Sequence, residues 1–309
     1  MKITRRVKEI LAHYESDNPG TKNNLARILG SGRLGGTGKM IILPVDQGLE
    51  HGPARSFAKN PAAYDPHYHW QLAIDAELNA FASTLGMLEA GADTFAGQIP
   101  TILKVNSSNS LSRLKEDADQ AITATVDDAL RLGCAAIGFT VYPGSDNCFN
   151  QMEELRELAA DAKRAGLAVV AWSYARGGDL SKAGETALDI ISYAAHVVAS
   201  LGAHIIKVKL PTSELELGAA KKVYEEEKIA RTTLTERVKH VVEACYAGKR
   251  LVVFSGGEAK DLDGLYNEAR AIRDGGGNGS IIGRNTFQRP RDEAIAMLDQ
   301  MVKIYQGKA

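Results

Sequence analysis

The chain has 309 residues, 44% of them apolar, with 37 basic and 38 acidic side chains and a formal net charge of -1. This length suits one large domain, and the balanced charge without blocks of one sign argues against a nucleic-acid partner. Three scattered cysteines predict a reducing cytoplasmic environment, and the absence of a signal-like start or a long apolar run predicts no export and no membrane span.

The first 38 residues predict an N-terminal helical arm, in which one amphipathic helix precedes the glycine-rich segment GSGRLGGTGK at 30–39. A phosphate-binding loop of the form GxxxxGK[ST] would need glycine at position 33 and Ser or Thr at position 40, where the chain has Arg33 and Met40. We therefore interpret the segment as a flexible linker that leads into a catalytic domain at 39–309.

From residue 39 onwards, short β-rich runs alternate with helical patterns. Most of the runs are continuously apolar, which is typical of parallel strands that are covered on both faces. Eight strands are predicted, at 39–48, 93–98, 101–106, 135–144, 168–175, 204–210, 250–257 and 280–285.

Amphipathic helical patterns lie between several of these strands and after the last one. The clearest are at 152–166, 186–202, 232–248 and 291–307. Eightfold repetition of strand and helix predicts an α/β fold, a (β/α)8 TIM barrel with an N-terminal helical extension. A doubly wound open sheet is the alternative, because alternation alone does not prove closure. The second and third predicted strands leave no room for a helix between them, which departs from the ideal pattern.

Two strand ends carry groups suited to anions. In a TIM barrel, phosphate commonly binds after strands seven and eight. Strand seven ends in FSGGEA, where Ser255 offers a hydroxyl and Gly256 and Gly257 let backbone N–H groups approach an anion. Strand eight ends in IIGRN, where Gly283 permits close approach and Arg284 offers a planar set of donors. These ends predict a phosphorylated substrate; the alternative is turn glycines beside a surface arginine.

The sixth strand, HIIKVKL, contains two lysines in an otherwise apolar run. Lys207 and Lys209 point the same way, because alternate residues of a strand share a face. If Ile206 and Val208 face the helices, both lysines face the barrel mouth. Desolvation and a second ammonium would then lower the lysine pKa and make the amine a nucleophile for Schiff-base chemistry. Alternatively, both lysines extend into solvent from a frayed strand end.

Other strand ends supply groups that handle protons. Asp46 ends the first strand, where a carboxylate can exchange protons and hold a neighbouring cation. Tyr174 ends the fifth strand and shares a face with Trp172 and Arg176. Nearby positive charge, to which Lys104 adds, is expected to lower the pKa of the phenol and suit it to general acid-base catalysis.

A metal-dependent site is a competing interpretation, in which His51, His67 and His69 act with Asp46 or Glu50. His67 and His69 lie two residues apart near the start of a predicted helix, so their side chains diverge. A metal would also make a Schiff-base lysine redundant. We therefore expect neither a metal nor another cofactor.

Six segments, taken in order, resemble the archaeal-type class I fructose-1,6-bisphosphate aldolases, also grouped as DhnA-like aldolases. The match runs in register from about residue 39 to 290 through VDQGLEHGP, GFTVYPGS, AWSYARGG, IIKVKL, SGG and GRNTFQR. The resemblance implies a (β/α)8 barrel that cleaves fructose 1,6-bisphosphate reversibly to dihydroxyacetone phosphate and glyceraldehyde 3-phosphate without metal, in glycolysis and gluconeogenesis. It also implies a homo-oligomer.

Carried over by position, the resemblance makes Lys207 the Schiff-base lysine, Tyr174 the proton-transfer tyrosine and Asp46 its strand-one aspartate. The choice of Lys207 over Lys209 rests on this register alone, and Lys209 becomes a substrate contact that lowers the pKa of its neighbour. The other implied substrate or phosphate contacts are Gln47, where the family often has histidine, and Trp172, Arg176, Ser255, Gly256, Gly257, Gly283 and Arg284.

Two alternative functions remain open at this point. A related Schiff-base aldolase or transaldolase-like enzyme that acts on another phosphorylated ketose would keep the same lysine and phosphate contacts. A non-enzymatic phosphosugar-binding protein would keep the barrel but bind without turnover.

Overall fold

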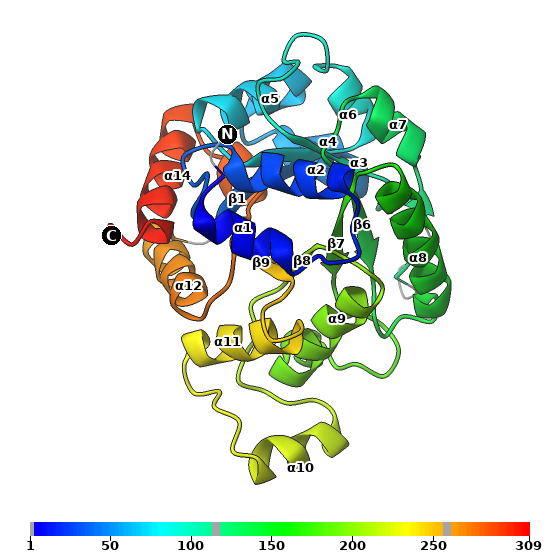
Figure 1. Ribbon diagram of the computed structural model, residues 1–309, viewed down its shortest axis with the longest axis vertical. Helices are drawn as coiled ribbons and strands as arrows, with labels where there is room; N and C mark the ends of the chain where they lie inside the picture. Colours follow the sequence, from blue (N-terminus) through cyan, green and yellow to red (C-terminus); the bar gives the residue numbers. More distant parts are fainter. Residues whose placement is uncertain (1–2, 113–117, 256–260) are drawn as a thin grey trace.

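The computed structural model describes residues 3–112, 118–255 and 261–309. In these residues, eight parallel strands close into a barrel in the order β1-β10-β9-β8-β7-β6-β3-β2 (Figure 1). This confirms the predicted (β/α)8 fold, and the open-sheet alternative is wrong. The barrel strands are β1 (Met40–Val45), β2 (Ala80–Ser83), β3 (Thr101–Lys104), β6 (Ala136–Val141), β7 (Ala168–Ser173), β8 (Ile205–Val208), β9 (Leu251–Ser255) and β10 (Gly279–Ile281).

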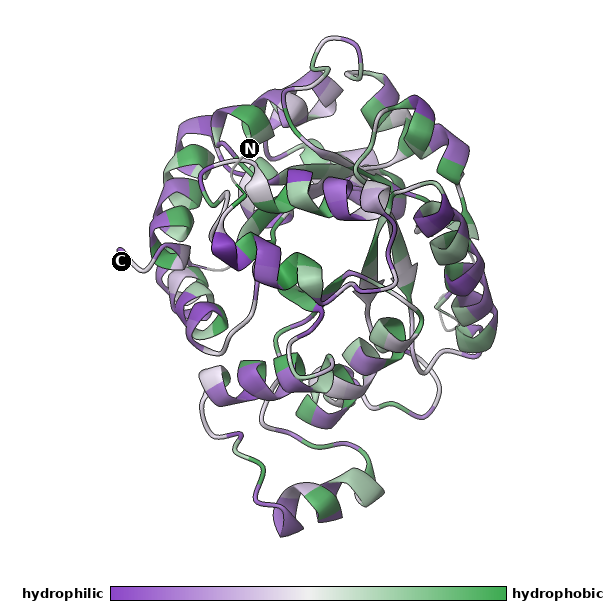
Figure 2. Cartoon of the chain, viewed as in Figure 1, coloured by the Kyte–Doolittle hydropathy of each residue, from purple (hydrophilic) through white to green (hydrophobic). Residues whose placement is uncertain are grey.

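Helices surround the barrel, with polar residues on their outer faces and apolar residues toward the strands (Figure 2). A short antiparallel ribbon, β4 (Asn106–Ser107) with β5 (Ala121–Ile122), lies in the connection from β3 to β6. The helices after the arm are α3 (Gln47–His51), α4 (Pro53–Phe57), α5 (Pro66–Asp75), α6 (Leu85–Glu89), α7 (Val126–Arg131), α8 (Cys148–Arg164), α9 (Leu188–Ser200), α10 (Gly218–Glu226), α11 (Leu234–Ala244), α12 (Leu262–Asp274), α13 (Arg284–Phe287) and α14 (Arg291–Tyr305).

One predicted strand is wrong. Residues 93–98 form turns, and the second strand of the barrel is β2, which pairs with β1 and β3. The short α6 occupies the connection from β2 to β3. A helix therefore does lie between the second and third strands of the barrel, where the predicted strands left no room for one. The segment AFAS that forms β2 is short and rich in Ala and Ser, and only its pairing with two neighbouring strands makes it a strand.

Alternate residues of the strands divide between two hydrophobic clusters. Ile206 and Val208 belong to the cluster between the strands and the helices, whereas Ile205 belongs to the cluster inside the barrel. The alternation predicted for β8 is therefore confirmed. Because side chains two residues apart share a face, Lys207 points into the barrel above Ile205.

The arm contains two helices, α1 (Arg5–Ala12) and α2 (Pro19–Gly30), where the sequence predicted one. Figure 1 shows both helices crossing the barrel opening. Their apolar residues, such as Ile10 and Leu29, join Met40 and other inward-facing residues at the amino ends of the strands. The arm therefore closes the end of the barrel opposite the carboxyl ends of the strands.

The glycine-rich segment after α2 is packed, so its interpretation as a flexible linker is wrong. Leu34, Gly35 and Gly36 are buried. The N–H of Gly36 donates to the carbonyl of Leu29 at 2.9 Å, and the N–H of Arg33 donates to the carbonyl of Glu77 at 2.9 Å. The division of the chain at residues 38 and 39 into arm and catalytic domain stays a prediction.

Tyr14 connects the arm to the strand that carries Lys207. Its buried hydroxyl donates to the carbonyl of His204 at 2.8 Å, directly before β8. The His204 ring accepts from the N–H of Val169 at 2.9 Å through Nδ1, so Nε2 carries the proton donated to Asp17 at 2.8 Å.

In the described part of the chain, no helix is long and apolar enough to cross a membrane.

Replacing Tyr14 with Phe should lower the free energy of unfolding by about 1 kcal/mol, because it removes a buried hydrogen bond and keeps the ring. Urea denaturation measures the change. The control is Tyr246→Phe, which removes an exposed hydroxyl that donates to Ser200 and should change stability by about 0.5 kcal/mol or less. Equal effects of the two substitutions would contradict a stabilising connection between the arm and β8 through Tyr14.

Candidate active site

Two adjoining cavities lie at the carboxyl ends of the strands. The larger has a volume of about 440 Å³ and the smaller about 50 Å³, and four residues line both: Gln47, Glu50, Tyr174 and Lys207. Every predicted site residue that the structure describes lines at least one of them. Gly256 and Gly257 lie outside the described residues.

Lys207 occupies the centre of this region. It lies opposite Trp172 in the ladder of β7 and β8 and is 6% exposed. Its Nζ lies 5.8 Å from the centroid of the Trp172 ring and 5.7 Å from that of Tyr174. Burial, assisted by the positive charges of Lys104 and Arg284, lowers its pKa to about 8. About a tenth of the amine is therefore neutral at pH 7, far more than in an ordinary lysine, as a nucleophile requires.

Lys104 and Asp46 form a buried ion pair beside Lys207, with Nζ 2.9 Å from Oδ2. Burial alone would raise the pKa of Asp46, but Lys104 and Lys207 hold it below its usual range. Burial would lower the pKa of Lys104, but Asp46 and Glu50 raise it. The pair therefore stays charged, and Lys104 is a fixed cation near the amine of Lys207.

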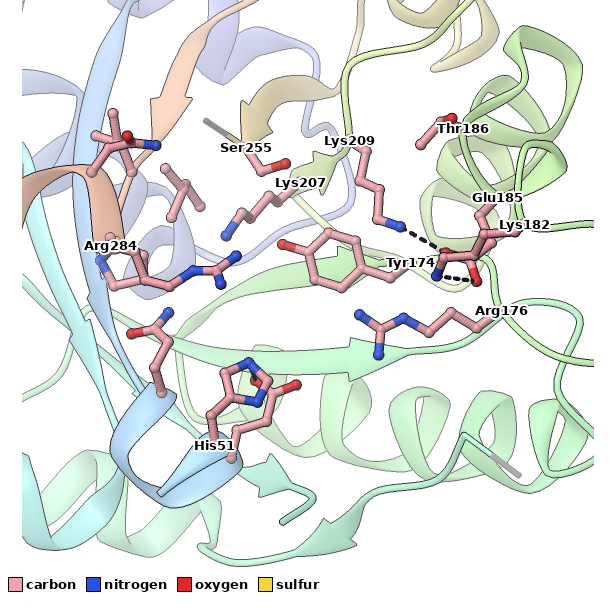
Figure 3. Close-up of a pocket in the computed structure, with 17 residues that line it drawn as sticks. His51, Tyr174, Arg176, Lys182, Glu185, Thr186, Lys207, Lys209, Ser255 and Arg284 are labelled. Carbon is pink, nitrogen blue, oxygen red and sulfur yellow. Dashed lines mark hydrogen bonds and ion pairs between the residues drawn. The ribbon is translucent and has the colours of Figure 1, made fainter. Parts of the chain in front are cut away.

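Lys209 is held in a different way from Lys207. Its Nζ lies 3.0 Å from Oε2 of Glu185, which also lies 3.0 Å from Lys182. Figure 3 shows Lys209 at the edge of the larger cavity, turned toward Glu185. Both lysines thus reach the barrel mouth as predicted, but the cations with the largest lowering effect on the pKa of Lys207 are Lys104 and Arg284 rather than the expected Lys209.

Tyr174 follows β7 and its hydroxyl points toward Lys207 and Arg284 in Figure 3. The expectation that neighbouring cations lower its pKa is wrong. Burial and the negative charges of Asp46 and Glu50 raise the pKa well above its usual value and outweigh the opposite effect of Arg176. The free protein therefore presents a protonated phenol, which is a proton donor.

The predicted anion-binding ends meet at the larger cavity, which Ser255, Gly283 and Arg284 line together. A Cβ atom at Gly283 would lie 2.8 Å from the carbonyl oxygen of Pro44, so this close approach requires glycine. The guanidinium of Arg284 points into the cavity toward Lys207 (Figure 3). The open cavity, the close backbone approach at Gly283 and the positive charge of Arg284 thus favour an anion at this end of the larger cavity.

The remaining predicted contacts divide between the cavities. Trp172 lines the smaller cavity, and a Cβ atom at Gly138 would lie 2.3 Å from its ring, so glycine makes room for the indole. Arg176 lines the larger cavity, where its guanidinium lies 5.1 Å from the centroid of the Tyr142 ring.

Sequence reasoning missed several lining residues. Tyr142 follows β6, so its position at a strand end was a usable signal. Gln120 and Glu185 lie in long connections between strands, where residue type and spacing provide no signal.

The histidines of the metal-dependent interpretation do not converge. His67 Nε2 lies 2.7 Å from the carbonyl oxygen of Ala90, and His69 Nε2 lies 2.8 Å from that of Ala63. His51 alone of the three lines the larger cavity. Among the described residues, no group of three or more His, Cys, Asp or Glu side chains is arranged to hold a metal ion.

The chain is a parallel (β/α)8 barrel, and a buried lysine of lowered pKa lies at the carboxyl ends of its strands. This combination defines a class of enzymes suited to Schiff-base chemistry. The family model of the DeoC/LacD family aldolases matches residues 40–289. The chain belongs to this family of aldolases.

Named relatives cover most of the chain. It is 35% identical over 313 aligned residues to a probable class 1 fructose-bisphosphate aldolase of Chlamydia muridarum, covering 97% of this chain and 88% of the relative. It is 34% identical to the class 1 fructose-bisphosphate aldolase of Thermoproteus tenax, covering 82% and 84%.

A solved archaeal fructose-1,6-bisphosphate aldolase has the same fold over most of its length. It is 32% identical with a TM-score of 0.72, and the match covers 87% of this chain and 94% of that one. Its catalytic lysine is covalently bound to the carbinolamine intermediate of the substrate.

Acetylation of Lys207 by dilute acetic anhydride should increase with pH through a midpoint near 8, because only the neutral amine reacts and the folded pKa is about 8. Asp46→Asn should move this midpoint to lower pH, since the Asp46 charge raises the pKa of Lys207. Peptide mass spectrometry follows the modification. Asp299→Asn, a change on the outer helix α14, is the control with an unchanged midpoint. An unchanged or higher midpoint in Asp46→Asn would contradict this electrostatic account.

Proposed function

We propose that this chain is a metal-independent class I aldolase that cleaves fructose 1,6-bisphosphate reversibly to dihydroxyacetone phosphate and glyceraldehyde 3-phosphate through a Schiff base on Lys207. One observation carries the proposal: the buried amine of Lys207 faces a cavity with cationic groups on two sides. Figure 3 shows Arg284 on one side and Arg176 and Lys209 on the other. This arrangement suits a ketose that carries a phosphate at each end.

In the proposed reaction, the neutral amine of Lys207 adds to the C2 ketone, and loss of water produces an iminium ion. Its positive charge accepts the electron pair of the C3–C4 bond when that bond breaks, so the iminium takes the role that a metal has in other aldolases. Lys207 rather than Lys209 is the proposed nucleophile, because Lys207 is buried with a lowered pKa whereas Lys209 is paired with Glu185.

Tyr174 is the proposed proton carrier. In the iminium complex, the nearby positive charge lowers the pKa that burial raises in the free protein, and the phenol loses its proton to solvent. The phenolate then takes the proton of the C4 hydroxyl as the C3–C4 bond breaks, and the phenol formed in this way donates that proton to the enamine carbon left after cleavage. Asp46, held as a carboxylate by Lys104, assists the proton transfers of imine formation.

The phosphate contacts are assigned by position along the cavity. Ser255, Gly283 and Arg284, with Gly256 and Gly257, are proposed to bind the phosphate near C1. Arg176 and Lys209 lie on the other side and are proposed to bind the second phosphate. Trp172 and Gln47 are proposed to contact the sugar close to Lys207.

The proposal also covers the oligomeric state, the cellular compartment and the pathway of the enzyme. We infer a homo-oligomer in the cytoplasm that acts in glycolysis and gluconeogenesis. The names of the relatives support the reaction, and three cysteines without disulfides suit a reducing compartment.

Cleavage of fructose 1,6-bisphosphate should proceed at the same rate with and without excess chelator, because the iminium ion is the electron sink. A panel of phosphorylated ketoses measured alongside tests the substrate. Higher activity on another ketose would favour a related Schiff-base aldolase, and binding without turnover would favour a phosphosugar-binding protein. Inhibition by the chelator would contradict the proposed mechanism.

Borohydride treatment with dihydroxyacetone phosphate should attach the ligand to the peptide that contains Lys207, and Lys207→Ala should abolish both labelling and cleavage. Lys209→Ala is the matched control and should keep the label on Lys207. Labelling that survives Lys207→Ala would refute the assignment.

Tyr174→Phe should keep imine formation while cleavage falls by about 10²–10⁴-fold, the usual contribution of general acid-base catalysis. The borohydride trap measures the first step and the cleavage assay the second. Full cleavage activity in this variant would remove Tyr174 from the mechanism.

A further inference from the structure

The smaller cavity is a polar chamber on the inner side of Lys207. Its volume of about 50 Å³ exceeds the minimum of about 10–15 Å³ that a buried water molecule needs. Lys207 forms part of its wall together with Asp46, Lys104, Gln47 and Gln120. The chamber therefore offers room for water in contact with the proposed Schiff-base nitrogen.

Two acceptor atoms in the chamber have no partner among the described residues: Oε1 of Gln120 and Oε1 of Gln47. Gln120 is 5% exposed, and its amide nitrogen donates to the hydroxyl of Tyr142 at 2.7 Å, which orients the side chain. A buried polar atom without a partner costs about 1–3 kcal/mol unless a ligand or water satisfies it. Both glutamines line the same chamber, so water in the chamber is an available partner for their acceptor atoms.

A donor is present in the same chamber. The ammonium group of Lys104 has three N–H bonds, and within the described residues its hydrogen-bonding partner is Asp46. A water molecule that accepts from Lys104 and donates to the carbonyl of Gln120 and to Gln47 or Asp46 has the two to four partners of a well-held buried water.

We propose that this chamber is a water site for the Schiff-base reaction, and that Gln120 is the positioning residue that holds the water against the carbon bound to Lys207. The inference rests on the proposed function, because a water is consumed only if an imine forms. It also assigns a use to Gln120, which lies in the connection from β3 to β6.

The chemistry balances in both directions. In hydrolysis, the water oxygen bonds to C2 of the iminium and one water proton passes to Asp46, which returns it to the nitrogen. The C–N bond then breaks with its electron pair going to nitrogen, and the second water proton passes from the C2 hydroxyl to that nitrogen as the C=O double bond forms. Iminium plus water thereby becomes ketone plus the ammonium form of Lys207. In imine formation the same steps run backwards, and the ketone oxygen leaves as water into the chamber.

The test measures how long the imine survives. Protein is incubated with isotopically labelled dihydroxyacetone phosphate, chased with a large excess of unlabelled ligand, and reduced with borohydride at successive times. In Gln120→Met, which matches glutamine in length but lacks the acceptor, label on Lys207 should decay about tenfold more slowly, the equivalent of one hydrogen bond. Exchange of the ligand's carbon-bound hydrogen with solvent, per imine present, should not change because that step adds no water to C2 of the imine.

Matched variants separate positioning from packing. Gln120→Glu keeps an acceptor oxygen and should restore much of the decay rate, whereas Gln306→Met, a glutamine that donates to Arg33 on the outside of the barrel, should behave as the unmodified protein. Gln47→Met removes the second acceptor and should slow the decay as well, which keeps the test available if Gln120→Met fails to fold.

The possible outcomes distinguish the two proposals. Absence of label on Lys207 in the unmodified protein would overturn the proposed function. Label that forms normally but decays at the unmodified rate in both Gln120→Met and Gln47→Met would overturn the water site alone. Equal slowing by Gln120→Met and Gln120→Glu would show that Gln120 acts through packing, and would also overturn it.

Discussion

The buried ion pair of Asp46 and Lys104 is the interaction on which the rest of the site depends. Three ionisable groups, these two and Lys207, lie within one barrel interior where a lone charge is costly. Asp46 neutralises Lys104, with 2.9 Å between the charged atoms. Lys207 is thereby left without an ion-pair partner in the described part of the chain, and burial shifts it toward the neutral amine. One lysine remains a cation so that the other can become a nucleophile.

The position of Lys207 also depends on the packing of the arm against the barrel strands. Residues of α1 and α2 close the amino end of the barrel, and the interior there is apolar, whereas the interior at the carboxyl end is polar. Tyr14 and His204 link the arm to the start of β8. The packed arm and the four-residue β8 hold Lys207 in place, and the strand ends with the connections that follow them supply the groups that surround it.

Periodicity and residue type predicted the barrel, seven of its strand segments and the inward direction of Lys207, because alternation along a strand is a local property. They failed at β2, where Ala and Ser have little strand preference, and at 93–98, where the segment DTFAGQ forms turns. They also failed for the glycine-rich segment, whose burial depends on contacts with residues far along the chain.

The sequence by itself determined which residue types stand at the strand ends, and through them the family resemblance and the two candidate lysines. Only the tertiary structure decided which lysine is desolvated and which is paired, because Glu185 and Asp46 come from distant segments. It likewise reversed the expected shift in the pKa of Tyr174, since the net effect depends on the burial and distances of every surrounding charge. Those quantities depend on the spatial arrangement of all the strand ends, which no local pattern specifies.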